Sequence, residues 1–169
     1  MSNRTLVACI VCGLIAIAFQ PTSAAAATPS LAGSWQFTLT PSSPTGAAPV
    51  EIPGLATFTS NGSVVETDGS EFVTKPASTT PLPTAGTPGH GIWQLGNTPI
   101  SLYVQYISLV LNPDGSLYAR NITTMMLSLN TTSDQFSGTF VTDQAIGTQT
   151  KVISSGAVSG QLIPHSPLP

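Results

Sequence analysis

The chain reads Ile100-Ser-Leu-Tyr-Val-Gln-Tyr-Ile-Ser-Leu-Val-Leu111, then Asn112-Pro-Asp-Gly115, then Ser116-Leu-Tyr-Ala-Arg-Asn-Ile-Thr-Thr-Met-Met-Leu-Ser-Leu129. Two long apolar runs around a short turn sequence predict a β-hairpin. Pro113 presets the backbone angle for a tight turn, the Asp114 side chain can cap it, and Gly115 supplies the positive φ that a following bulge needs. Both runs are about twice the usual strand length of roughly five or six residues. Strands this long coil, and a coiled antiparallel sheet tends to close into a barrel.

Apolar side chains occupy both faces of this hairpin. In its first run, one face carries Ile100, Leu102, Val104, Tyr106 and Val110, and the other carries Tyr103, Ile107, Leu109 and Leu111. A strand of a half-solvated sheet would alternate between apolar and polar residues. We therefore expect one face to line an interior and the other to be covered by a loop or a partner chain.

The rest of the chain after residue 27 shows strand patterns and no convincing helical periodicity. Further strands are predicted at 31–39, 55–60, 63–67, 90–95, 135–142 and 147–163, with Asn61-Gly62 turning one hairpin and Ser154-Ser-Gly156 bending the last strand. The proline-rich stretch 76–89 has the length of a lid or binding loop. The predicted fold is all-β: a single antiparallel up-and-down β-barrel of about eight strands over residues 28–163, followed by a flexible tail, 164–169.

The N-terminus has the pattern of a secretory signal peptide. Arg4 precedes an apolar run from Leu6 to Phe19, and small residues follow it as far as Ala27. About fourteen apolar residues are short for a membrane span, which needs around twenty. We predict cleavage after residues 1–27, which removes Cys9 and Cys12, and a secreted protein, periplasmic or extracellular, with no disulfide and no stable membrane insertion.

Charge excludes several classes of partner. The chain has 4 Lys and Arg against 7 Asp and Glu, a net charge of −3, and charged residues make up only 7% of it. Because so few cations cannot neutralise many phosphates, neither nucleic acid nor an anionic membrane surface is an expected partner. The sequence contains no cofactor-binding motif, and we predict no cofactor.

Gly33-Ser34-Trp35, at the start of the first predicted strand, resembles the GxW signature of lipocalins and the wider calycin barrels, in which the Trp closes one end of the barrel. Tyr103-Val-Gln-Tyr106 is similar to the lipocalin Y-x-x-Y element, with Leu102 where an acidic residue usually precedes it. The late lipocalin Arg has no counterpart, since the last strand offers only Lys151. Pro88-Gly-His-Gly-Ile-Trp93 looks like a motif of uncharacterised secreted bacterial barrels, and the layout is also similar to that of allene oxide cyclase-like barrels.

Few side chains are candidates for chemistry. His90 is the weak candidate for proton transfer, because His165 lies in the tail; a structural rim histidine explains it equally well. Glu66, Asp68 and Glu71 form an acidic cluster, whose spacing departs from the EF-hand loop, so we interpret it as a solvated turn and predict no metal site. Arg120 stands among apolar neighbours, where a buried guanidinium would need a carboxylate or an anionic ligand.

Three functions remain open. The leading hypothesis is a barrel that binds a small, largely apolar ligand in its interior. Its predicted wall comprises Trp35, Trp93, Tyr103, Tyr106, Arg120, Met125 and Met126. The second is a barrel-type cyclase or isomerase in which His90, Arg120 or a Tyr polarises a hydrophobic substrate. The third is a homo-oligomerising structural protein of the cell exterior, since both hairpin faces are apolar.

Overall fold

The computed structural model describes residues 30–43, 48, 50–69, 85–98 and 100–164. The signal-peptide prediction for residues 1–27, most of the proline-rich stretch, Glu71 and the tail from residue 165 lie outside these ranges. The strands are β1 (Gly33–Pro41), β2 (Ile52–Phe58), β3 (Ser63–Asp68), β4 (Ala85–Gly86), β5 (Gly89–Leu95), β6 (Ser101–Leu111), β7 (Leu117–Leu129), β8 (Gln135–Ile146) and β9 (Gln149–Leu162). The described part of the chain contains no helix with the length and hydrophobicity that a bilayer crossing requires.

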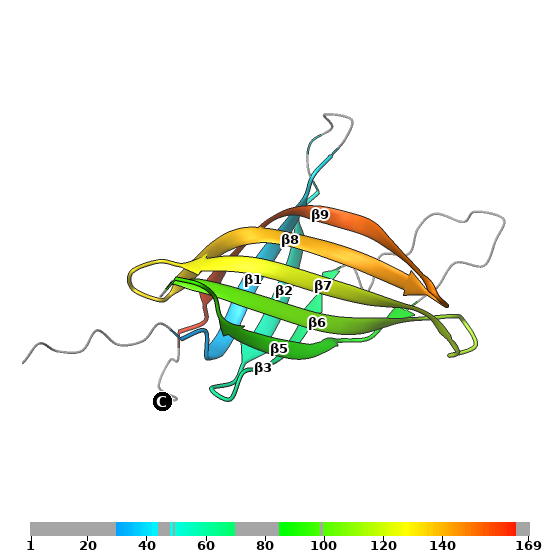
Figure 1. The fold of residues 1–169 in the computed structure, drawn as a ribbon, viewed down its shortest axis with the longest axis horizontal. Helices are drawn as coiled ribbons and strands as arrows, with labels where there is room; N and C mark the ends of the chain where they lie inside the picture. Colours follow the sequence, from blue (N-terminus) through cyan, green and yellow to red (C-terminus); the bar gives the residue numbers. More distant parts are fainter. Residues whose placement is uncertain (1–29, 44–47, 49, 70–84, 99, 165–169) are drawn as a thin grey trace, which may run out of the picture.

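Eight strands form a closed antiparallel barrel (Figure 1). Each strand pairs with the next along the chain, β3 with β5 across the intervening segment, and β9 returns to pair with β1. The two-residue β4 pairs with the end of β6. The predicted all-β, up-and-down barrel is therefore confirmed.

The central hairpin turns as its sequence predicts. Gly115 has φ 82°, its N–H donates to the Asn112 carbonyl at 2.9 Å, and the Asp114 carboxylate accepts from the Ser116 N–H at 2.9 Å. The register changes immediately after the turn, because Val110 lies opposite Ala119 while Leu111 lies opposite Leu117. This bulge adds local twist to β6 and β7.

The last strand is one long strand, as predicted, and its irregularity lies just before the residues where we expected a bend. β9 runs through Ser154-Ser-Gly156, and a bulge lies at Ile153, since Thr142 pairs with Ser154 and Asp143 with Val152. Gly156 has a role in strand packing. A Cβ there would overlap the Thr40 carbonyl oxygen, so this glycine permits close approach of β1 and β9.

The two ends of the barrel differ. At the closed end, on the left in Figure 1 with the β7–β8 turn, Trp35 is fully buried and its indole N–H donates to the Leu31 carbonyl at 2.8 Å. The Trp35 and Phe136 rings lie 5.1 Å apart. The open end is the opposite one, where the β6–β7 and β8–β9 turns lie. Trp35 and Phe136 thus fill the closed end of the barrel.

Aromatic rings in the core lie over glycines of neighbouring strands. Phe136 pairs with Gly160, and Phe37 with Gly54. A Cβ on either glycine would overlap the ring opposite, within 2.8 Å of several of its atoms. The missing side chain is therefore what makes room for each ring in the narrow interior.

Replacing Gly160 should test this packing. We expect Gly160→Ala to lower the free energy of unfolding by about 1–3 kcal/mol, the usual cost of overpacking a core. Gly69→Ala is the matched control, because its Cβ would meet nothing closer than 3.6 Å. Chemical denaturation of both variants gives the comparison; equal stabilities would contradict the ring-over-glycine account, whereas partial recovery in Gly160→Ala/Phe136→Leu would support it.

The β7–β8 turn is held by Asp134. Its carboxylate accepts from the Thr132 hydroxyl at 2.5 Å and from the Asn130 side-chain amide at 2.6 Å. These hydrogen bonds lower the pKa of Asp134 below its usual value of 3.8, and the bond from Thr132 has the largest effect. A carboxyl with a lowered folded-state pKa stabilises the fold above its unfolded pKa, and this contribution is lost as pH falls through the folded pKa.

We therefore expect Asp134→Asn to reduce stability at pH 7 but not in strong acid. The stability difference between parent and variant should shrink as the pH is lowered from about 5 to about 2, because the parent carboxylate becomes protonated in that window. Denaturant midpoints across the pH series measure it. A difference that stays constant over the series would show that the turn does not depend on the charge of Asp134.

Candidate functional site at the open end of the barrel

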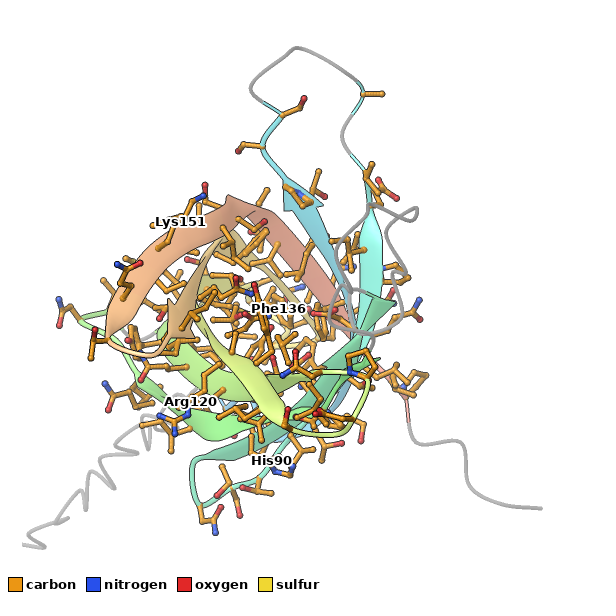
Figure 2. All side chains as sticks on the ribbon, turned by 90° about the vertical axis from the view of Figure 1, so that its right-hand side faces the viewer. His90, Arg120, Phe136 and Lys151 are labelled. Carbon is orange, nitrogen blue, oxygen red and sulfur yellow. The ribbon has the colours of Figure 1, made fainter. Side chains whose placement is uncertain are left out.

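The interior changes character along the barrel. At the closed end the inward side chains are large and buried, among them Trp35, Phe37 and Phe136. Towards the open end, four inward residues are small or polar and only half-buried: Ser108, Asn121, Gln144 and Ser154. These residues alternate with outward-facing ones and share a face with buried neighbours, so they point into the barrel. Since they are only half-buried, solvent reaches the inner wall from this end. Figure 2 looks from this side, with Phe136 inside the ring of strands.

A row of polar side chains crosses the inner wall of four strands. Register places Tyr106 on β6 opposite Thr123 on β7, Thr123 opposite Thr142 on β8, and Thr142 opposite Ser154 on β9. Tyr106, Thr123 and Thr142 are all at least nine-tenths buried. The hydroxyls of Thr123 and Thr142 lie 3.0 Å apart and hydrogen-bond to each other. This inner polar row marks where the apolar core ends.

A second polar row lies one step nearer the open end. Ser108 pairs with Asn121, and Asn121 with Gln144, whose side-chain amide donates to the Asn121 side-chain oxygen at 3.1 Å. Register continues the row to the exposed Lys151 on β9, at the rim of the barrel. The bulge at Ile153 sets this register, since without it Val152 would lie opposite Gln144. We call the two rows together the polar wall.

Two carboxylates face the interior, which corrects the solvated-turn interpretation. Glu66 is 4% exposed and Asp68 is also buried. The interpretation was wrong because β3 continues to Asp68, and its alternation puts both acids on the same side as the buried Val64. A Cβ on Gly89 would overlap Glu66 Oε1 and lie 2.6 Å from Tyr106 Cδ2. Gly89 thus lets the Glu66 carboxyl and the Tyr106 ring share the inner wall.

Four of the seven predicted wall residues face inward. Trp35, Tyr106 and Met125 are buried in the core, and Trp93 is half-buried against it. The Trp93 indole N–H donates to the Thr59 carbonyl at 2.9 Å, which ties β5 to the β2–β3 turn. Of these four, Tyr106 belongs to the polar wall, and Met125 lies one row behind it.

Tyr103, Arg120 and Met126 lie on the outer face, which corrects the expectation that they line the interior. Met126 is 63% exposed, and Figure 2 shows Arg120 outside the ring of strands. The reason is alternation: Leu102, Ala119 and Met125 are buried and face inward, so the residue that follows each of them must face outward. The Tyr103 hydroxyl accepts an outer-face hydrogen bond from the Gln105 side chain at 3.2 Å.

His90 also faces outward, as Figure 2 shows. It is exposed on β5 between Val65 of β3 and Ile107 of β6. It therefore cannot reach a molecule held inside the barrel. Sequence reasoning missed Thr123 and Thr142, because their role depends on a register between strands that hydrophobic alternation alone does not reveal.

A separate hollow of about 320 Å³ lies outside the wall of β1–β3. It is lined by Gln36, Pro53, Gly54, Leu55, Thr67, Asp68 and Gly69. Gln36, Leu55 and Thr67 form one outer cross-strand row, so this hollow does not belong to the polar wall. Among the described residues, no group of three or more His, Cys, Asp and Glu could hold a metal ion.

The comparisons with known proteins found no match: no protein-family model, no curated protein and no solved structure matches the chain. The geometry of the open end is therefore the basis on which a function can be inferred.

Proposed function

We propose that this protein is an exported barrel that binds a small, largely apolar ligand in the open half of its interior. The observation that carries the proposal is the half-buried inner wall at the open end, in front of a fully packed apolar core. Ligand sites are typically concave and largely apolar, with a few convergent polar groups, and the mouths of β-barrels are a common location. At the closed end Leu31 and Trp35 are fully buried, so side chains fill the interior there.

Two further features support this reading. Gly33-Ser34-Trp35 resembles the lipocalin signature, and Trp35 lies at the closed end, so a lipocalin-like binder would take its ligand from the opposite end. The signal-peptide pattern of residues 1–27 supports export to the periplasm or the extracellular space. Of the groups considered for a cyclase, Tyr106 faces the interior, whereas His90 and Arg120 do not.

A bulky side chain in the mouth should block binding. Ser154 and Ser155 are neighbours on β9, but Ser154 lies opposite the inward Thr142 and Ser155 opposite the outward Val141. We expect Ser154→Phe to weaken binding of the apolar fluorophore N-phenyl-1-naphthylamine at least about tenfold, a loss of about 1.4 kcal/mol. Fluorescence titration of the exported protein measures this, with Ser155→Phe as the matched control.

Two results would contradict the proposal. One is a parent protein that does not bind the fluorophore. The other is an equal loss of affinity in Ser154→Phe and Ser155→Phe, since binding would then not depend on the interior.

Self-association is a second candidate function, favoured by the outer surface. An apolar patch is centred on Ile107, which is 44% exposed and lies beside Ile122 of β7. Val65 of β3, Ile92 of β5 and Leu109, two residues further along β6, extend this patch and are all exposed. Large apolar patches on soluble proteins often mark contact sites. The chain also has few charged residues, so electrostatic repulsion between two copies opposes association only weakly.

We expect the exported protein to sediment as a dimer if the Ile107 patch is a self-contact. Ile107→Lys should then convert it to a monomer, because association would bury an unpaired ammonium. Leu55→Lys is the matched control, since Leu55 is 52% exposed on β2, away from the patch. A monomeric parent in analytical ultracentrifugation, or a dimer that survives Ile107→Lys, would exclude this contact.

A further inference from the structure

We infer that the ligand of the open end is an amphiphile whose head group is neutral and forms hydrogen bonds, such as a hydroxyl or an amide. This inference rests on the proposed function and goes further by assigning the chemistry of the ligand. The head group lies against the polar wall.

The polar wall lies between two apolar rows. On the core side, Val104, Met125 and Phe140 pair in that order and are all buried. On the side of the open end, Val110 pairs with the buried Ala119. Since burying a polar group without a hydrogen bond costs free energy, the polar head of the ligand belongs at the polar wall between these rows.

The side chains of the polar wall set the chemistry of the head group. Apart from Lys151 at the rim, they carry hydroxyl or amide groups: Ser108, Asn121, Gln144, Tyr106, Thr123, Thr142 and Ser154. Each such group both donates and accepts hydrogen bonds. A pair of hydroxyls that share one hydrogen bond, as Thr123 and Thr142 do, keeps a second hydrogen and further lone pairs. A neutral head group that both donates and accepts hydrogen bonds therefore matches the polar wall.

Charged head groups fit less well. The Glu66 carboxyl is buried beside Tyr106 on the same inner wall, and as a carboxylate it would repel an anionic head. Lys151 would in turn repel a cationic head as it passed the rim, although its exposure weakens the effect. Hydroxyls and amides also solvate a full charge less completely than water does, so a neutral head is transferred from water at lower cost.

Four ten-carbon compounds test the inference on the unmodified exported protein. Bound N-phenyl-1-naphthylamine is displaced with decane, 1-decanol, decanoate or decyltrimethylammonium. We expect 1-decanol to displace the fluorophore at a concentration at least about tenfold lower than any of the other three.

A pair of double variants then locates the effect. Asn121→Leu/Gln144→Leu replaces a hydrogen-bonded inner pair by apolar side chains of similar size, and the advantage of 1-decanol over decane should fall to about threefold or less. Gln105→Leu/Thr124→Val is the control. It removes an outer-face pair, Gln105 Nε2 to Thr124 Oγ1 at 3.3 Å, and should leave the advantage unchanged.

The outcomes separate the two claims. No binding of the fluorophore by the parent overturns both the proposed function and this inference. Binding of the fluorophore with equal displacement by all four compounds, or with decanoate or decyltrimethylammonium strongest, overturns the inference alone. An unchanged decanol advantage in Asn121→Leu/Gln144→Leu also overturns it.

Discussion

The narrow bore of an eight-strand barrel is the constraint on which the rest of this structure depends. Such an interior is just wide enough for side chains to fill it. Rings as large as Phe37 and Phe136 fit only because Gly54 and Gly160, their partners on the neighbouring strands, have no side chain. The glycines of these strands are therefore part of the core, although they add no apolar area to it.

The same constraint divides the barrel into two halves. Where rings and branched chains face inward, from Trp35 to Phe140, the interior is solid and buried. Where Ser108, Asn121, Gln144 and Ser154 face inward, the side chains are small or polar and only half-buried, and solvent reaches the wall. The distribution of side-chain size along the strands therefore decides which end of the barrel is filled and which end is open to solvent.

Much of this architecture could be predicted from local signals. Pro113, Asp114 and Gly115 specify the central turn through their own backbone preferences, so the hairpin was correct to within one residue at each strand. The acids of β3 were misassigned, because the polar residues that follow Val65 read as a turn. Their burial depends on barrel closure, which brings Glu66 beside Gly89 and Tyr106, residues far from it in the chain.

By itself, the sequence determined the strands, their turns and which residues share a face, because these depend on neighbours within a few positions. It could not determine which face became the inside, since both faces of the central hairpin are apolar and alternation is symmetric. The tertiary structure decided that: closure of the barrel placed Tyr106 and Met125 inside and Tyr103, Arg120 and Met126 outside. It also decided the partners across strands, such as Thr123 and Thr142, because register is set when all eight strands bury one continuous core.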